Sequence, residues 1–381
     1  MYAIIKLSVA FQSTLRDMIL LNHMKINRSI VLKILIYLGI VAIAVSSYMQ
    51  YGKPYLKELA IEGQDRTRIN DLNFLNSILK VTLPAPSNAV YISLPSNDPS
   101  CANLDLPSLP AGWSYHCSNQ NNYQKTNGKG WIPVDFTELS GSSFLKILPA
   151  DPVNSADGLF YYAYAAGQEG WVLTSLLNSD KFLKQSAGSD GGTDLNRFEI
   201  GSDLNIWAKA SGLAGHRKFN KSFNGVDDYE NIGLSGLDSP GAEITIEFWA
   251  KPDEAKTTSV IIANPDDSAN RINIHFPWVG NMIMWDYGDI DAGGRLTTEF
   301  KLPWYDETAH WVFISGIDGM KIYRNGEIIA ENKTHSVFTK GDKTLDIGRG
   351  LPLFWKGFLG EIRIYNRVLS AKEIQLLYLL K

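Results

Sequence analysis

The stretch HWVFISGIDGMKIYRNGEII, residues 310–329, decides the fold of the C-terminal part of the chain. Apolar and polar residues alternate along it, and Asp318-Gly319 and Asn325-Gly326 interrupt the alternation. These dipeptides favour hairpins, because both central residues of a type I′ turn need a positive φ. Similar short runs occur on both sides: FNGVDDYENI at 223–232, ITIEFWAKP at 244–252 and FLGEIRIYNRVLSAKEI at 358–374. The pattern predicts an antiparallel fold of two sheets.

These four segments, in this order, resemble the laminin G-like jelly roll of the concanavalin A-like superfamily. A further segment, RINIHFPWVGNMIMWDYGD at 271–289, is similar to a recurring bacterial version of the module. The resemblance implies an all-β antiparallel jelly-roll sandwich over residues 219–381. Members of this family mostly bind carbohydrate, matrix or cell-surface partners, so it also implies a binding role.

The chain has 381 residues and a formal charge of −4. This length suggests two or three domains. A nucleic-acid-binding domain is expected to be basic, so the charge argues against a nucleic-acid partner.

Residues 30–49, IVLKILIYLGIVAIAVSSYM, are apolar over the length needed to cross a bilayer, and Lys33 near the start can snorkel to the interface. We therefore predict one transmembrane helix, with residues 1–29 in the cytoplasm. The positive-inside rule places the C-terminal part outside, because Lys53 and Lys57 are offset by Glu58 and Glu62, whereas the preceding segment carries Lys6, Arg16, Lys25 and Arg28. The alternatives are a cleaved signal peptide, with Ala44 to Ser47 as a weak cleavage site, and a true start at Met24.

Apolar residues continue at helical spacing beyond this segment and predict a helical stalk over residues 50–83. They are Leu56, Leu59, Ile69, Leu72, Leu75 and Leu79. A long helix that is half membrane span and half amphipathic resembles type IV pilins and type II secretion pseudopilins. The run DRTRINDLNFLNSIL at 65–79 is similar to the ARDARRISDL stretch of bacterial pilin-like proteins.

Four later segments extend the pilin-like resemblance: VYISLPSNDPSCANLDLPSLPAGWSYHC at 90–117, GKGWIPVDF at 128–136, LPADPVNSADGLFYYAYA at 148–165 and GWVLTSLLNSDKF at 170–182. They imply an α+β pilin-like head over residues 84–207. The pilin pattern places Gly before the processing site and Glu at the fifth mature position. Ser29 and Ile34 stand near these positions, so processing and filament assembly are in doubt.

The two cysteines of the chain, Cys101 and Cys117, lie in the head segment. In an exported head we expect a disulfide, which would close a loop of about 15 residues and stabilise the fold by roughly 3 kcal/mol. The pilin-like resemblance also implies a structural bridge here. Two buried thiols are the alternative if the topology is inverted. The small and polar run AKASGLAGHRK at 208–218 predicts a linker between the head and the jelly roll.

The resemblance to laminin G-like domains implies a calcium site, because members often hold one ion between the first-strand turn and the penultimate strand. The matching positions are Asn224, Asp228 and Glu361, with Asn224 where many members have Asp. Alternatively, Asp227 and Asp228 cap a turn and Glu361 accepts hydrogen bonds from it. The acidic residues Asp286, Asp289 and Asp291 are read as solvated hairpin acids, with a loop metal site as the alternative.

Sugars stack on exposed aromatic rings while nearby polar groups bind their hydroxyls. Trp278, followed by Gly280-Asn281, is the best candidate, and packing is the alternative for each ring. The predicted ligand-binding residues are Trp278, Asn281, Trp304, Tyr305 and Trp355. We expect Trp249, Trp311, Phe313 and Tyr365 in the core, and His275 and His310 as packed residues rather than metal ligands.

Three functions are compared. The first is a membrane-anchored bacterial surface protein whose jelly roll binds a glycan or a protein, with calcium as the only cofactor considered. The second is a pilin-like filament subunit or minor pseudopilin with a jelly-roll tip. The third, a glycoside hydrolase, needs paired carboxylates, and the Glu-x-Asp-x-(x)-Glu run of family 16 is missing around Glu243 and Glu247. No catalytic residue is predicted, and we expect a binding protein rather than an enzyme.

Overall fold

The fold is described from a computed structural model that covers residues 28–79, 88–137, 145–168, 170–233, 241, 243–255, 258–264, 266–339, 344–350 and 352–379. The predicted cytoplasmic segment up to residue 27, with Met24, lies outside these ranges. The chain divides into two compact units, Met1–Ile61 and Glu62–Lys381.

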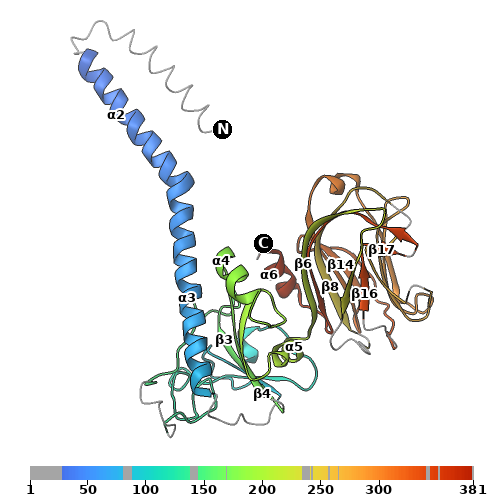
Figure 1. Cartoon of the computed structure of the whole chain (residues 1–381), viewed down its shortest axis with the longest axis horizontal. Helices are drawn as coiled ribbons and strands as arrows, with labels where there is room; N and C mark the ends of the chain where they lie inside the picture. The colour runs from blue at the N-terminus through green and yellow to red at the C-terminus, as the bar shows by residue number, and fades with distance from the viewer. Residues whose placement is uncertain are drawn as a thin grey trace. The chain divides into compact units, whose positions relative to one another are not determined.

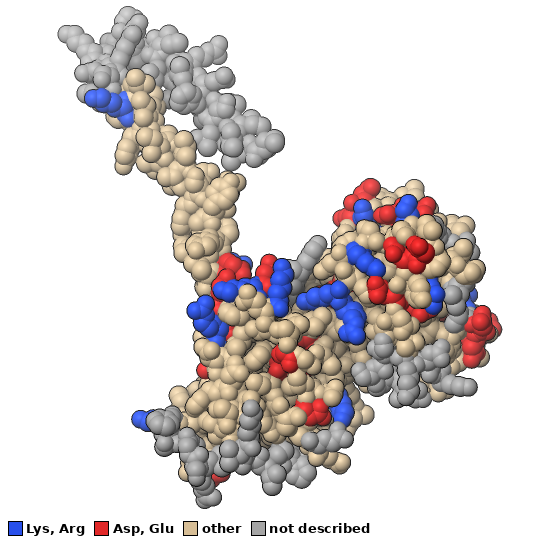
Figure 2. Space-filling model, in the orientation of Figure 1, with Lys and Arg blue, Asp and Glu red and all other residues tan. Residues whose placement is uncertain are grey.

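The N-terminal unit is helical. It contains α2 (Arg28–Ser47), a π-helical turn η2 (Tyr48–Gly52) and the beginning of α3 (Lys53–Leu79). Pro54 explains the wide turn, because it has no N–H to bond the carbonyl four residues earlier and its ring crowds that carbonyl. Lys53 instead donates its N–H to Tyr48 O, five residues back. The helix is long and apolar enough to cross a membrane, as a signal sequence also is. Figure 2 shows a stretch without charged side chains along it.

The head contains a five-stranded sheet in the order β2-β1-β3-β4-β5. Its strands are β1 (Ala89–Ile92), β2 (Ser114–His116), β3 (Tyr162–Gly167), β4 (Gly170–Leu176) and β5 (Arg197–Gly201). Neighbouring strands are antiparallel except β1 and β2. Short helical segments connect them: η3 (Ala102–Leu104), α4 (Asp180–Phe182), η5 (Leu183–Ala187) and α5 (Asn205–Ser211).

The C-terminal half of α3 packs against one face of this sheet (Figure 1). Leu72, Leu75 and Leu79 are fully buried, as their helical spacing predicts, and they join Tyr162 and Trp171 in one cluster. Leu56 and Leu59, in the part of the helix assigned to the first unit, are exposed. The stalk is therefore amphipathic only where it meets the head.

A buried ion cluster fixes α3 to the head. Arg68 donates to Asp151 from Nε at 2.7 Å and from Nη2 at 3.0 Å, and to Asp65 from Nη1 at 2.8 Å. Asp65 in turn accepts hydrogen bonds from the backbone N–H and the hydroxyl of Ser179, both at 2.7 Å. These polar groups are fully buried yet paired, which a buried charge requires. The DRTR motif thus has a structural role.

The opposite face of the head sheet is covered by α5 and by the loop that carries the cysteines. Cys101 and Cys117 form the predicted disulfide, with a Cα–Cα distance of 5.5 Å. Cys101 is buried in a cluster with Val90, Trp207 and Ala210. The bridge therefore holds the loop onto the sheet.

The C-terminal domain consists of two six-stranded sheets, in the orders β12-β11-β10-β9-β16-β7 and β15-β14-β13-β8-β19-β6. The first has β7 (Glu230–Gly233), β9 (Ile261–Ala263), β10 (Arg271–Trp278), β11 (Met282–Gly288), β12 (Arg295–Glu299) and β16 (Thr344–Ile347). The second has β6 (Leu213–Asn224), β8 (Ile244–Pro252), β13 (Ala309–Gly316), β14 (Gly319–Arg324), β15 (Glu327–Glu331) and β19 (Lys356–Tyr365). The domain also contains a small two-stranded sheet, a short helical turn and a C-terminal helix. These are β17 (Arg349–Gly350) with β18 (Leu353–Phe354), η6 (Leu302–Asp306) and α6 (Ala371–Leu379).

The two sheets enclose one core between them, as predicted (Figure 1). Trp311 and Phe313 are buried in it, and Tyr365 packs on the outer side with α6, whereas Trp249 is only half-buried. Both predicted hairpins are present. Asn325 and Gly326 have positive φ values of 51° and 82°, as a type I′ turn requires. At Asp318-Gly319 only the glycine has a positive φ, so that hairpin is closed by another turn.

The stretch expected to be a linker, residues 208–218, is regular structure. It contains the end of α5, a left-handed residue at Gly212 and the start of β6 at Leu213. Its small and polar residues gave a loop signal, but β6 is an edge strand, where such residues are tolerated. Head and jelly roll therefore follow each other directly.

Candidate ligand-binding site

The outer face of three neighbouring strands, β10, β11 and β12, carries a dense set of polar side chains. Alternation turns Ile272, Ile274, Trp285 and Leu296 into the core, so the residues between them face outward. Register places the outward residues in rows: Asn273, Asp286 and Arg295 in one row, and His275, Met284 and Thr297 in the next. Arg271 and Trp278 flank these rows. We call these eight residues the β10–β12 face.

A fully buried carboxylate organises this face. Asp286 accepts hydrogen bonds from Arg295 Nε at 2.6 Å and Nη2 at 2.7 Å, and from Arg271 Nη2 at 2.7 Å. The sequence reading of Asp286 as a solvated hairpin acid was wrong, because the two arginines and its neighbours remove it from water. Held in this way, both guanidinium groups have fixed orientations and present further N–H groups at the surface.

His275 lies beside this ion cluster and is nearly buried. Asn273 donates its amide to His275 Nε2 at 3.1 Å, so the ring proton is on Nδ1, 3.2 Å from Ser259 Oγ. Burial lowers the pKa of His275 to about 4. The ring is therefore neutral at neutral pH, and His275 is a packed residue as predicted.

Two polar atoms of the β10–β12 face have no partner among the residues that the structure describes. They are Asn273 Oδ1 and Arg271 Nε, and both are buried. A buried polar atom without a hydrogen bond is unfavourable by about 1–3 kcal/mol, so such atoms are rare. The pair consists of one acceptor, Asn273 Oδ1, and one donor, Arg271 Nε, both shielded from solvent.

Trp278 ends β10 and lies against this polar cluster. Its ring contacts the His275 ring in a T-shaped arrangement, with centroids 4.2 Å apart. The side chain is half-buried, and within the described ranges its indole N–H has no hydrogen-bond partner. Trp278 thus offers an aromatic surface beside His275, at the end of β10 opposite to Arg271.

Three of the other predicted ligand residues, Asn281, Trp304 and Tyr305, follow Trp278 in the chain. Tyr305 donates its hydroxyl to Asn281 Oδ1 at 3.0 Å, so the structure brings these two together. Trp304 packs against Phe300 and Trp311. Its ring also lies under the Arg324 guanidinium, 4.9 Å from the centroid. Trp304 and Tyr305 therefore mainly pack against neighbouring side chains of the protein.

Trp355, predicted to bind a ligand at the surface, lies in the core instead. It is buried in the core, contacts Phe223 and donates its indole N–H to the carbonyl of Phe276. The sequence places it beside turn-like residues, but the chain after β18 turns inward and carries the ring between the sheets. No ligand at the surface can reach it.

The residues predicted to bind calcium do not converge. Asn224 pairs with Lys356 across β6 and β19, whereas Glu361 pairs with Lys218. Glu361 is therefore five residues along β19 from the partner of Asn224, a distance of about 17 Å. Asn224 Oδ1 accepts N–H groups of its own turn, and Glu361 is bonded to Arg363 and His216 instead. These three residues do not fit one shared ion, and among the described residues no cluster of three His, Cys, Asp or Glu side chains has the geometry of a metal site.

The sequence analysis predicted Trp278 as a ligand residue and did not predict most of the other residues of the β10–β12 face. Arg271, Asn273 and His275 alternate with core residues on one strand, and Asp286 does so on the next, so the alternation was a usable signal. The partner strand β12 was not recognised, and without it the charge that compensates Asp286 could not be located.

The fold agrees with a comparison against protein families. Residues 224–375 match the Laminin_G_3 family of the concanavalin A-like lectin/glucanases superfamily. The C-terminal domain is a laminin G-like jelly roll. The match begins at Asn224, the last residue of β6, and ends within α6, so it covers most of the laminin G-like domain and none of the head.

No curated protein matches the chain. Among solved structures, botulinum neurotoxin type C, described as depending on two ganglioside molecules for cell entry, is 16% identical with a TM-score of 0.35, over 44% of this chain and 47% of that one. The binding domain of botulinum neurotoxin DC, in complex with rat synaptotagmin II, is 14% identical with a TM-score of 0.34, over 44% of this chain and 47% of that one. A third structure is domain 4 of AbnA, a GH43 extracellular arabinanase from Geobacillus stearothermophilus, in complex with arabinotriose. It is 17% identical with a TM-score of 0.33, over 43% of this chain and 96% of that one. This chain spans about half the length of the neurotoxin chains, and similarity at this level does not establish a function.

Proposed function

We propose that this protein is a membrane-anchored binding protein of the bacterial surface whose laminin G-like domain recognises a carbohydrate through the β10–β12 face. The observation that carries the proposal is the contact of the half-buried Trp278 with His275, which is hydrogen-bonded to Asn273, on a strand that also carries Arg271. An aromatic surface beside fixed, planar hydrogen-bonding groups suits a pyranose, which has an apolar face and a rim of hydroxyls.

Binding rather than catalysis is proposed, because the buried carboxylates near this face are neutralised. Asp286 is held by two arginines, and a glycosidase needs one carboxyl group free to donate a proton and a second nearby. Glu247, named in the hydrolase alternative, lies in the other sheet and is bonded to Arg363 and His310.

The test uses the full-length protein in detergent on a glycan array, followed by titration calorimetry with the best ligand. Trp278→Ala should weaken binding at least about tenfold, because aromatic residues at the centre of a contact contribute most of its free energy. Tyr229→Ala, an exposed aromatic at β7 on the far edge of the same sheet, is the matched control and should bind normally.

An array without glycan ligands, or ligands bound equally well by Trp278→Ala, would reject the glycan proposal. A protein captured from the host envelope in a Trp278-dependent manner would move the proposal to a protein partner. Both outcomes leave the anchoring unaffected, so it is tested separately.

For the anchor we propose a single span by α2 with the head and the laminin G-like domain outside the cytoplasm. The apolar, exposed helix and the disulfide support this arrangement, since disulfides persist in oxidising compartments. Protease added to intact spheroplasts should remove the laminin G-like domain and leave the N-terminal segment in the membrane. Protection of the domain until lysis would contradict this topology, and recovery of a shortened soluble protein would indicate a cleaved signal peptide.

A pilin-like filament subunit is the second candidate. It is favoured by the attachment of the C-terminal half of α3 to the head sheet through Arg68, Asp65 and Asp151, and by the exposed apolar side chains of α2. Sheared cell fractions examined by negative-stain microscopy test it. Filaments labelled by an antibody to the laminin G-like domain would support assembly, and retention of all protein in the membrane fraction would reject it.

Calcium remains in the proposal in a narrower form. Because Glu361 lies apart, we propose that a rise in Tm with calcium arises at the Asn224–Asp228 turn and is abolished by Asp228→Ala. Glu361→Ala should lower Tm equally with calcium and with chelator, because it removes bonds to Arg363 and His216. A calcium shift lost only in Glu361→Ala would contradict this assignment.

A further inference from the structure

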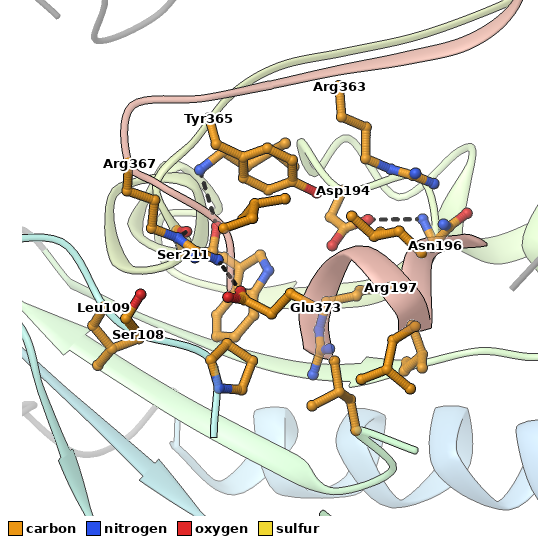
Figure 3. A pocket seen from close by; sticks show the side chains of 18 of the residues that line it. Ser108, Leu109, Asp194, Asn196, Arg197, Ser211, Arg363, Tyr365, Arg367 and Glu373 are labelled. Carbon is orange, nitrogen blue, oxygen red and sulfur yellow. Dashed lines mark hydrogen bonds and ion pairs between the residues drawn. The ribbon is translucent and has the colours of Figure 1, made fainter. Parts of the chain in front are cut away.

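A cavity between the head and the laminin G-like domain is lined by buried donors that have no acceptor. It has a volume of about 100 Å³ and is formed by β5, α5 and the cysteine loop of the head, with β19, α6 and the segment between them. Figure 3 shows Arg367 bonded to Ser211 and Glu373, with Arg197 approaching from the head sheet. Ser108 is exposed at the edge, so the cavity can be reached from solvent.

Three side-chain nitrogens of lining residues are buried without a hydrogen-bond partner within the described ranges: Arg197 Nη2, Arg367 Nη1 and Trp207 Nε1. Their residues are 5%, 7% and 5% exposed, so water in bulk does not solvate them. All three are donors, and no lining residue in the described part of the chain has an unpartnered buried acceptor. The missing group is therefore an acceptor with several lone pairs.

The charge of Arg197 identifies this acceptor as an anion. Arg363 is bonded to Glu247 and Glu361, and Arg367 to Glu373. Arg197 bonds only the Thr174 hydroxyl, at 3.0 Å, and stacks on Trp207 at 4.7 Å, with no carboxylate in ion-pair distance among the described residues. A buried cation without a counter-ion is unfavourable by several kcal/mol, and a bound anion removes that penalty.

Much of the remaining wall is apolar and favours an organic molecule, although Asp194, Asn196 and the ion-paired Glu373 also line the cavity. Leu109, Leu213 and Leu369 line the cavity together with the faces of Tyr161 and Tyr365. The volume is somewhat below the roughly 150 Å³ of a cavity that takes benzene, so the occupant has only about five heavy atoms. We propose that this cavity binds a small monocarboxylate with a short aliphatic body, its carboxylate on Arg197, Trp207 and Arg367.

The ligand bridges both domains in this arrangement. Arg197 and Trp207 belong to the head, and Arg367 follows β19 of the laminin G-like domain. Direct contacts already join the domains: Arg367 Nε donates to Ser211 O at 2.8 Å, Leu195 N donates to His216 Nδ1 at 3.0 Å, and the exposed Lys372 pairs with Asp105 at 3.0 Å. A bound carboxylate therefore adds a buried connection between the domains, and it should raise the Tm of both.

The test measures binding of acetate, butyrate and lactate to the full-length protein in detergent by titration calorimetry and thermal unfolding, with acetamide and butyramide as neutral counterparts and inorganic phosphate as a second oxyanion. At least one carboxylate should bind and raise Tm while its amide does not. Arg197→Gln should weaken that binding by about tenfold or more, since a charge-assisted bond is lost. Arg217→Gln, the same change at an exposed strand position, should have no effect.

Trp207→Phe removes one donor and keeps the ring, so it should weaken binding several-fold without unfolding the head. This variant keeps the proposal testable if Arg197→Gln does not fold. The proposal is overturned if no carboxylate binds, if amides bind as well as acids, or if phosphate alone binds. Equal losses in Arg197→Gln and Arg217→Gln would also overturn it. None of these outcomes depends on glycan binding at the β10–β12 face.

Discussion

The sharpest stability prediction concerns a buried ion network on the outer side of the second sheet. Glu247 of β8 is fully buried and is bonded to Arg363 of β19 and to His310 of β13, at 2.6 Å from His310 Nε2. Burial alone would raise the pKa of Glu247, but Arg363 and His310 hold it below its usual value. Replacing this residue by leucine removes the carboxylate and leaves a similar volume.

The expected loss follows from what remains after Glu247→Leu. Breaking a buried pair by removing one partner destabilises by about 3–5 kcal/mol, because the other charge stays buried. Arg363 keeps one bond, from Nη2 to Glu361 at 2.6 Å, so we expect the lower end, about 3 kcal/mol. For 150–250 residues, 1 kcal/mol shifts Tm by about 2–4 °C, which predicts a fall of about 6 °C or more.

Differential scanning calorimetry of the full-length protein in detergent measures this shift. The control is Glu230→Leu, which removes the exposed pair with Lys221 and should change stability by less than about 1 kcal/mol. The double variant Glu247→Leu/Arg363→Met should recover most of the loss, since no unpaired charge remains. A Tm for Glu247→Leu equal to that of the control, or no recovery in the double variant, would refute the reasoning.

Three further predictions concern single groups. Cys101→Ser/Cys117→Ser should destabilise the head by about 3 kcal/mol, measured by chemical denaturation; a reduced protein as stable as the oxidised one would contradict it. Burial raises the pKa of Glu199 to about 9, so the stability that its neutral form contributes is lost as pH rises from about 4.5 through 9. Glu199→Gln should therefore be more stable than the unchanged protein at alkaline pH. Parallel curves of Tm against pH for the two proteins would argue against this. Burial lowers the pKa of His275 to about 4, so the laminin G-like domain should lose stability as pH falls from about 6.5 to 4, and His275→Gln should flatten this slope in acid unfolding curves.

The jelly roll could be read from the chain because its signals are local. Alternation with period two, the Asn325-Gly326 turn and the apolar spacing of Leu72, Leu75 and Leu79 each depend on a few neighbouring residues. The Cys101–Cys117 disulfide joins residues that are further apart in the sequence, and it was predictable because the chain has two cysteines. Local physics was also enough to identify an apolar helix long enough for a membrane.

Strand pairing decided what the local signals could not. Asp286 is buried because Arg295 from β12 lies beside it, and Glu361 is bonded to His216, which is 145 residues earlier in the chain. Trp355 and Trp278 both follow turn-like sequences, but one turns between the sheets and the other stays at the surface. The residues that surround Arg197 in the cavity come from both domains. Electrostatic and packing energies depend on distance in space, and the sequence alone specifies that distance only between near neighbours in the chain.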